Sequence, residues 1–167
     1  ELPTATVVDG SDDGTDGDGH GDDGVLRAAD VTRGDVLGEG AFGVVRRGTL
    51  RVRGGEKVDV AIKEMKPGAM DALAAKQLVD EAASFKRLPP HANVVRFYGV
   101  LYSPQLAVLL QFCPRGALLD ALYGRDPTRH VAFSDEQLAR IVLDVARGLA
   151  HLHAHRVVHR DVAARNV

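Results

Sequence analysis

An aspartate and an asparagine stand five residues apart at the end of this chain, and the pair His159-Arg160 directly precedes the aspartate. The residues between Asp161 and Asn166 are mostly apolar. An aspartate in this setting can take a proton from a hydroxyl nucleophile, and an asparagine at this distance can hold a metal ion beside the phosphates of a nucleotide. The spacing therefore predicts phosphoryl-transfer chemistry.

Charge is distributed unevenly along the 167 residues. Residues 1–24 hold eight acidic residues and no lysine or arginine, which leaves 15 acidic against 21 basic residues in the rest of the chain. A mildly basic body suits a polyanionic small ligand such as a nucleotide, but its charge density is far below that of nucleic-acid-binding proteins. We therefore expect no nucleic-acid partner, and the length suggests one domain.

Cysteine content and hydropathy limit the setting of the protein. The single cysteine, Cys113, excludes an internal disulfide and favours a reducing compartment. No apolar run approaches the roughly 18 residues that a membrane-spanning helix needs. The first residue is glutamate, so a targeting signal could precede it. We expect a cytoplasmic protein, or the cytoplasmic portion of a membrane receptor.

The first 24 residues are predicted to form a disordered linker, because Asp9–Gly24 is almost entirely aspartate and glycine and cannot bury apolar surface. A calcium loop is the alternative, since part of the acidic spacing resembles an EF-hand. Gly14 at a ligand position and the lack of flanking helical patterns argue against it. The residues that would serve as ligands are Asp12, Asp16, Asp18 and Asp23.

A glycine-rich motif, G-x-G-x-x-G, spans Gly38–Gly43 and is followed by Val45. Dinucleotide-binding folds share this spacing, but there the glycines open a helix. Here Val44–Val52 has the composition of a β-strand, with Gly48 interrupting it. The motif is therefore predicted to be the turn of a β-hairpin whose backbone N–H groups can approach phosphates. A plain glycine hairpin is the alternative if the motif is taken alone.

A lysine and a glutamate further along could complete a phosphate site. Gly54-Gly55 predicts a turn, and Val58–Lys63 then alternates as a strand that ends in the lysine. Behind the glycine-rich loop, Lys63 could reach the same phosphates, although a solvated charge is the alternative. A helix is predicted over about 69–88, and Glu81 beside its apolar stripe could point toward Lys63 or pair on the surface.

Together, the motifs Gly38–Val45, Val60–Lys63, Glu81 and His159–Asn166 resemble the catalytic domain of eukaryotic protein kinases, from about Val31 to the end of the chain. The resemblance implies an α+β fold within residues 25–167. An N-terminal lobe at about 31–112 would carry an antiparallel sheet and one helix. A hinge would follow at about 111–116, and the first helices of an α-rich C-terminal lobe would occupy 117–167.

The same resemblance implies an ATP pocket. The strand predicted at Leu106–Phe112 would lead into the hinge, with Leu110 as the gatekeeper. Asp120 would contact the ribose, although an exposed helix aspartate is the alternative, and Cys113 is either a reactive thiol or an ordinary half-buried one. The implied nucleotide contacts are Leu37, Gly38, Glu39, Gly40, Ala41, Phe42, Gly43, Val45, Ala61, Lys63, Leu110, Gln111, Cys113 and Asp120.

A long helix is predicted from Ser134 to His153, because Ser134 and Gln137 are spaced as a capping box and an apolar stripe follows at helical period. We expect this stripe to be core. His151 and His155 would share one helical face and could bind a metal, but histidines near a helix C-terminus also interact favourably with its dipole. The interaction with the dipole is the favoured interpretation.

The resemblance assigns roles in the final loop: Asp161 as the catalytic base and Asn166 as a ligand of Mg²⁺, with Lys63 and Glu81 completing the catalytic set. Serine/threonine kinases usually have lysine where this chain has Ala163. Arg165 instead resembles the arginine of tyrosine kinases, a loop that some tyrosine-kinase-like serine/threonine enzymes share. His159, Phe85 and Phe97 would join an apolar column, and Arg160 would pair with a phosphorylated activation loop.

The 167 residues contain no Asp-Phe-Gly or Ala-Pro-Glu motif, so we expect a kinase domain truncated after its catalytic loop. The family-implied cofactors are ATP and Mg²⁺, and the substrate is a protein hydroxyl, most simply tyrosine. We expect this polypeptide alone not to transfer phosphate. The alternative is a short, non-catalytic nucleotide-binding or regulatory module.

Overall fold

The structure is a computed structural model that describes residues 6–7, 26–40, 43–52, 54–66, 82, 85, 88–124 and 130–167. The described residues fall into two compact units. One holds the residues from Leu26 to Pro89 and from Val95 to Phe112, and the other holds β1, Pro90–Val94 and the chain from Cys113 onward. Each unit is described by itself. No helix among the described residues is long and apolar enough to cross a membrane.

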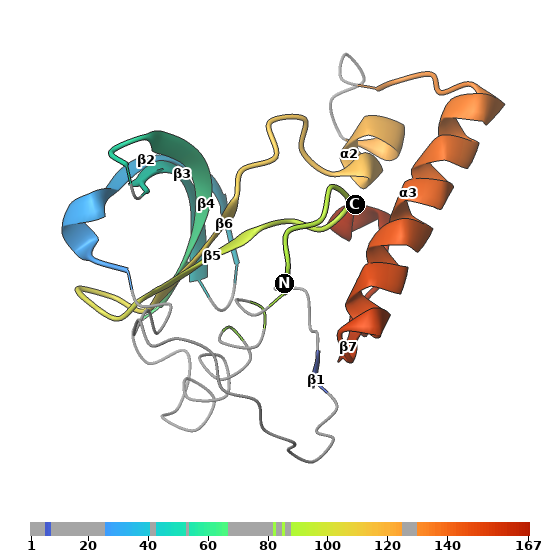
Figure 1. Cartoon of the computed structure of the whole chain (residues 1–167). Helices are drawn as coiled ribbons and strands as arrows, with labels where there is room; N and C mark the ends of the chain where they lie inside the picture. The colour runs from blue at the N-terminus through green and yellow to red at the C-terminus, as the bar shows by residue number, and fades with distance from the viewer. Residues whose placement is uncertain are drawn as a thin grey trace, which may run out of the picture. The chain divides into compact units, whose positions relative to one another are not determined.

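The first unit is a twisted antiparallel sheet of five strands in the order β2-β3-β4-β6-β5, preceded by the short 3-10 helix η1 (Ala28–Asp30) (Figure 1). This arrangement confirms the expected α+β class with an antiparallel N-terminal sheet. The strands are β2 (Val31–Glu39), β3 (Gly43–Arg51), β4 (Lys57–Met65), β5 (Phe97–Leu101) and β6 (Ala107–Gln111).

The sheet buries one face in a core to which all five strands contribute, because alternate residues of a strand point to the same side. The other face carries Val45, Ala61, Lys63 and Leu110. The register pairs Val45 with Lys63 and Ala61 with Leu110, so these side chains share that face. The core residues are Val31, Leu50, Val60, Ile62, Leu101, Ala107 and Leu109.

The expectation that Gly48 interrupts the strand is wrong: β3 runs through it from Gly43 to Arg51. A Cβ at Gly48 would lie 2.4 Å from Cδ1 of Ile62 and 2.5 Å from the carbonyl oxygen of Thr32. The glycine therefore allows the neighbouring strands and the core to approach closely. The predicted turn at Gly54-Gly55 is confirmed, with φ of 92° and 83°, values that suit glycine.

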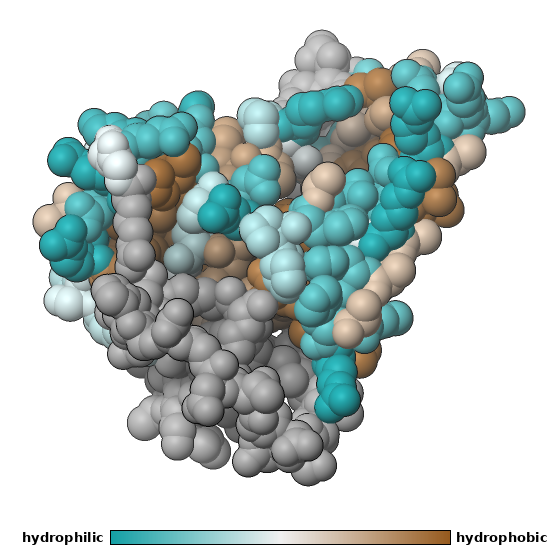
Figure 2. Space-filling model, viewed as in Figure 1, coloured by the Kyte–Doolittle hydropathy of each residue, from teal (hydrophilic) through white to brown (hydrophobic). Residues whose placement is uncertain are grey.

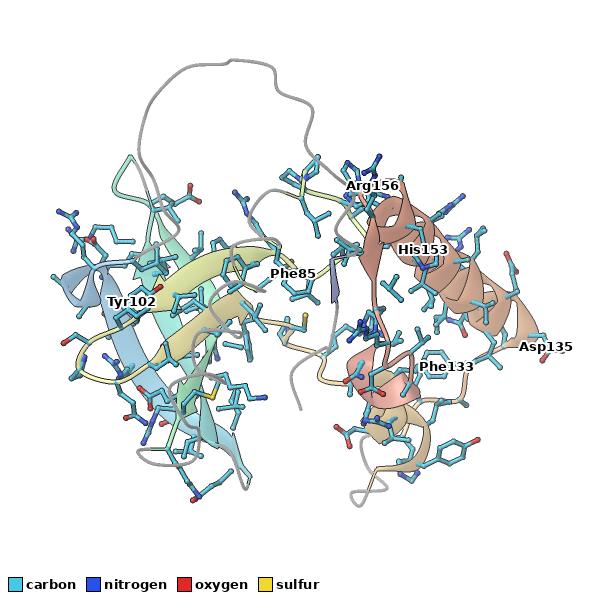
Figure 3. All side chains as sticks on the ribbon, turned by 90° about the horizontal axis from the view of Figure 1, so that it is seen from below. Phe85, Tyr102, Phe133, Asp135, His153 and Arg156 are labelled. Atoms are coloured by element: carbon cyan, nitrogen blue, oxygen red, sulfur yellow. The ribbon has the colours of Figure 1, made fainter. Side chains whose placement is uncertain are left out.

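The second unit contains α2 (Leu118–Tyr123), α3 (Asp135–Ala154), β7 (Val157–Val158) and the 3-10 helix η3 (Ala164–Asn166). The capping box is confirmed: Ser134 N donates to Oε1 of Gln137 at 2.9 Å, and Gln137 N donates to Oγ of Ser134 at 3.3 Å. Figure 3 shows Asp135 at one end of α3 and His153 near the other. The strand β1 (Thr6–Val7) pairs with β7 in antiparallel register.

The apolar stripe of α3 is only partly core. Leu152 is 4% exposed, whereas Val142 is 68% exposed and Leu138 is 37% exposed. Figure 2 shows hydrophobic side chains among hydrophilic ones along this helix. The buried end is the one that contacts β7 and the segment at 91–94, where a Cβ at Gly148 would lie 2.5 Å from the carbonyl oxygen of Asn93. Burial is therefore concentrated near the C-terminus of α3.

Candidate functional site

The glycine-rich motif forms the predicted hairpin between β2 and β3. Gly40 N donates to the carbonyl oxygen of Gly43 at 2.9 Å, which closes the turn. A Cβ at Gly38 or Gly40 would meet nothing within 4 Å, so there is open space beside the backbone of both residues for a phosphate to approach. A Cβ at Gly43 would instead lie 2.1 Å from the carbonyl oxygen of Glu64. The two arms of the hairpin therefore have different surroundings. Ala41 and Phe42 lie outside the described residues.

Lys63 is half-buried on β4, between Val45 of β3 and Val108 of β6. In the next row of the same face, Ala61 lies between Arg47 and Leu110. The structure therefore brings together four of the side chains expected to contact a nucleotide, Val45, Ala61, Lys63 and Leu110. Of the helix expected at about 69–88, Ala82, Phe85 and Leu88 are described; the first two are helical, and Leu88 lies in a bend. Glu81, the expected partner of Lys63, lies outside the described residues.

The strand β6 leads into the segment expected to be the hinge. Gln111 N donates to the carbonyl oxygen of Arg96 at 2.8 Å, and Phe112 N donates to that of Asp59 at 3.4 Å. Cys113 is exposed, and Gly116 N donates to the carbonyl oxygen of Cys113 at 3.1 Å, with φ of 72° at Gly116. The predicted break after the strand is confirmed.

Arg47 is a residue of this region that sequence reasoning missed. Its guanidinium carbon lies 4.8 Å from the centroid of the Phe112 ring, and its Nη2 is 2.9 Å from Oδ2 of Asp59. Arg47 therefore joins β3 and β4 to the first residue after β6. A cation two residues after Val45, on the same face of the strand, was the signal in the sequence that could have identified it.

Asp161 is the centre of the hydrogen-bonding in the final loop. Asn166 donates from Nδ2 to Oδ2 of Asp161 and to its carbonyl oxygen, both at 2.8 Å. Arg165 donates from Nη2 to Oδ1 of Asp161 at 2.6 Å. The spacing of the three residues reflects η3, which returns the chain so that residues 165 and 166 face residue 161.

These contacts keep Asp161 ionised. The hydrogen bond from Asn166 is the main cause that holds the pKa of Asp161 below its usual value, and burial opposes it. The charge and hydrogen bond of Arg165, and the nearby imidazole of His159, lower the pKa further. At neutral pH the group is therefore a carboxylate, the form that can accept a proton.

The backbone of this loop is anchored at both ends. Asp161 N donates to the carbonyl oxygen of His159 at 2.8 Å, and Leu118 N donates to that of Val167 at 2.7 Å. Arg160, which lies between His159 and Asp161, has a φ of 62° and is exposed. Asp120, the residue expected at the ribose, is exposed in the first turn of α2, the short helix that contacts η3.

Two metal-binding alternatives were raised by the sequence. The acidic residues at 12–23 lie outside the described residues. Rings of His151 and His155 lie 4.5 Å apart, His91 stacks on His151 at 4.6 Å, and Nδ1 of His155 donates to the carbonyl oxygen of His151 at 2.8 Å. Within the described residues, no group of three or more His, Cys, Asp or Glu side chains has an arrangement that could hold a metal ion. These three histidines cap and stack at the end of α3.

Known proteins are similar in sequence to both units of this chain. The family model of protein tyrosine and serine/threonine kinases matches residues 31–167. Activated Cdc42 kinase Ack of Drosophila melanogaster is 35% identical over 148 residues, which cover 86% of this chain and 13% of that protein. Angiopoietin-1 receptor of Danio rerio is 35% identical over 154 residues, covering 85% of this chain and 14% of the receptor.

Tyrosine-protein kinase Fer of Mus musculus is 37% identical over 143 residues, covering 85% of this chain and 16% of the relative. The chain thus spans about one seventh of the length of these relatives. The fold and the extent of the family match lead to one conclusion. This chain belongs to the family of protein tyrosine and serine/threonine kinases.

Proposed function

We propose that the chain contributes the nucleotide-binding sheet and the catalytic loop of an ATP-dependent protein kinase whose acceptor is a tyrosine hydroxyl. The observation that supports this most directly is the carboxylate of Asp161, ionised and held in place by Asn166 and Arg165. A kinase needs such a carboxylate to orient the acceptor hydroxyl and to receive its proton. Arg165 in place of a lysine at position 163 favours tyrosine over serine or threonine, and the sequence relatives include tyrosine kinases by name.

The residues present suit the cofactors that the family uses. Because Nδ2 of Asn166 donates both of its hydrogen bonds to Asp161, Oδ1 of Asn166 is oriented away from them, and an amide oxygen is a ligand that Mg²⁺ accepts. The open space at Gly38 and Gly40 suits the close approach of phosphates. ATP, bound with Mg²⁺, would supply the phosphoryl group that is transferred.

In the proposed mechanism, Asp161 accepts a hydrogen bond from the acceptor hydroxyl and holds its oxygen in line with the bond to be broken. The new oxygen–phosphorus bond forms as the bond between the transferred group and the leaving diphosphate breaks, and the hydroxyl proton passes to Asp161. Lys63 neutralises phosphate charge from the sheet, with Glu81 as its proposed partner. Since the transition state is loose, positioning matters more than base strength, which is consistent with the lowered pKa of Asp161.

Binding and transfer are tested separately on the 167-residue polypeptide. Calorimetric titration with ATP and Mg²⁺ should show binding that Lys63→Met weakens about tenfold or more, the size expected for loss of a charged contact. Radiolabelled ATP with a glutamate–tyrosine copolymer should show no meaningful incorporation, because the polypeptide has no Asp-Phe-Gly aspartate for Mg²⁺. Robust incorporation would refute the proposed inactivity. Tyrosine specificity is tested on a longer form that includes an Asp-Phe-Gly motif, where incorporation into a serine peptide but not into the copolymer would refute it.

The proposed location of the chain is the cytoplasm, either in a cytoplasmic protein or in the cytoplasmic portion of a membrane receptor. The relatives include a protein named as a receptor and others named only as kinases, so the parent protein could be of either kind. A non-catalytic nucleotide-binding module is the second candidate. This candidate would be favoured if a longer form that includes an Asp-Phe-Gly motif also incorporated no phosphate into the copolymer.

A further inference from the structure

An ion pair joins the glycine-rich loop to the end of β4. Nζ of Lys66 lies 2.7 Å from Oε1 of Glu39. Glu39 is the last residue of β2 and stands between Gly38 and Gly40, and Lys66 directly follows β4. The hydrogen bond from Lys66 and then its charge lower the pKa of Glu39. The carboxylate is therefore ionised and paired at neutral pH.

Lys66 follows a residue, Met65, whose backbone is held in place. Met65, the residue before it, is 5% exposed, and its N–H donates to the carbonyl oxygen of Leu106 at 2.9 Å. The side-chain amide of Gln105 donates to the carbonyl oxygen of Met65. Both backbone groups of Met65 are thus bonded to the segment that precedes β6. Lys66 can act as an anchor for a more weakly held partner.

The Glu39 end belongs to the more weakly held arm of the loop. Gly43, on the returning arm, lies directly against the backbone of Glu64, whereas a Cβ at Gly38 or Gly40 would meet nothing within 4 Å. The pairing of β2 with β3 is also irregular on the outgoing arm, with register shifts on both sides of Val36. Steric contact therefore fixes the returning arm, whereas the ion pair of Glu39 with Lys66 is a side-chain contact that holds the tip of the outgoing arm.

The pair lies on the face of the sheet away from Lys63. Glu39 is directly across from Val44, which is directly across from Glu64, and side chains of paired residues share a face. Val45 and Lys63 occupy the other face. Lys66 therefore contacts the loop from the opposite face of the sheet. It does not occupy the face on which Lys63 would meet phosphates.

We propose that Glu39 and Lys66 are positioning residues whose ion pair holds the outgoing arm of the glycine-rich loop in its nucleotide-receiving conformation. This inference rests on the proposed nucleotide-binding function of the loop. The two side chains are 61% and 40% exposed, so the pair adds little to global stability. A small free-energy difference is nevertheless enough to shift the population of a loop between its conformations. A loop that is preorganised in the binding conformation binds its ligand more tightly.

Hydrogen exchange on the nucleotide-free chain tests the loop directly. In Glu39→Gln, the amides of residues 38–43 should exchange about two- to fivefold faster than in the wild type, the range expected for an exposed ion pair. Lys66→Gln should give the same increase, and the double variant should add nothing further. The charge-swapped pair Glu39→Lys with Lys66→Glu should restore protection. The affinity for ATP with Mg²⁺ should fall by the same factor in the single variants.

Glu56→Gln is the matched control, because Glu56 is exposed in the turn between β3 and β4 and its loss removes the same charge. It should leave both exchange and affinity unchanged. Wild-type exchange rates in Glu39→Gln, or no rescue by the swapped pair, would overturn the proposal. If no form of the chain binds ATP, the proposed function fails, and the exchange data alone still decide whether the pair holds the loop.

Discussion

Asn166 donates from one side-chain nitrogen to two oxygens of Asp161, the carboxylate Oδ2 and the backbone carbonyl, each at 2.8 Å. The two bonds fix the orientation of both side chains. They leave Oδ1 of Asp161 to Arg165, which lies 2.6 Å away. The residue proposed to hold Mg²⁺ is thus also the residue that sets the protonation of the proposed base.

Asn166→Ala should raise the pKa of Asp161 toward its ordinary value, because the hydrogen bond from Asn166 is the main cause of the lowered pKa. A carboxyl group whose pKa is lower in the folded than in the unfolded chain stabilises the fold at pH values above the unfolded pKa. This stabilisation is lost as the pH falls through the folded pKa. The variant should therefore protonate Asp161 at a higher pH than the wild type does. Carboxyl NMR titration measures the shift.

The control for this prediction is Asn93→Ala, which removes an exposed asparagine outside the final loop. It should leave the titration of Asp161 unchanged. Arg165→Ala should also raise the pKa of Asp161, because both the charge and the hydrogen bond of Arg165 lower it. An unchanged pKa of Asp161 in Asn166→Ala would contradict the prediction.

A second prediction concerns Glu64, a buried carboxylate that bridges two strands. Its Oε1 lies 2.5 Å from Nε of Arg33, and its Oε2 lies 3.0 Å from Nε of Arg46. Glu64→Gln keeps the shape but removes the charge that both guanidinium groups share. We expect a loss of about 1–3 kcal/mol in the free energy of unfolding, measured by urea denaturation followed by circular dichroism.

Arg33 increases the sensitivity of this cluster, because its Nη2 is buried without a hydrogen-bond partner among the described residues. Loss of the Glu64 charge would leave that guanidinium less compensated. Glu56→Gln should change the free energy of unfolding by no more than about 0.5 kcal/mol, as expected for an exposed residue. Equal effects of the two substitutions would show that the cluster contributes nothing specific.

Local signals in the sequence predicted the local structure well. The glycine hairpin, the Gly54-Gly55 turn and the Ser134 capping box each depend on residues within a few positions of one another, and all three are confirmed. The alternation around Val60 and Lys63 predicted which side chains share a face. In each case the preference is set by the backbone over a short stretch.

Contacts between distant positions could not be predicted in the same way. Glu64 meets Arg33 across 31 positions, and Lys66 meets Glu39 from the end of β4, with all of β3 between them in the chain. Gly48 looked like a strand breaker because glycine disfavours strands, and only the neighbouring Ile62 shows why it is tolerated. The stripe of α3 was correctly predicted as helical, but periodicity does not say how much of a face is covered.

A third prediction follows from Gly48. An added methyl group would lie 2.5 Å from the carbonyl oxygen of Thr32, a backbone atom that cannot move without disturbing β2. Gly48→Ala should therefore lower the free energy of unfolding by about 1–3 kcal/mol, as overpacked substitutions do. Gly38→Ala, where a Cβ meets nothing within 4 Å, should have little effect on unfolding in the same urea measurement. A neutral Gly48→Ala would mean that the strands separate easily at this point.

The last prediction concerns Arg47, which stacks on Phe112 and pairs with Asp59. A planar guanidinium can make both contacts at once, whereas an ammonium cannot reproduce the stacking. Asp59 also accepts the backbone hydrogen bond of Phe112, at 3.4 Å. Arg47 therefore restrains Phe112, a residue of the expected hinge, through its ring, while Asp59 restrains the same residue through its backbone.

Arg47→Lys should loosen Phe112 while leaving the net charge unchanged. An exposed cation–π contact contributes about 0.5–1 kcal/mol, so the Phe112 amide should exchange about two- to fivefold faster. Arg51→Lys is the matched control, because Arg51 is exposed at the end of the same strand and lies across from Lys57. Unchanged exchange at Phe112 in Arg47→Lys would show that the backbone bond to Asp59 alone holds this residue, and that the stacked ring adds no restraint.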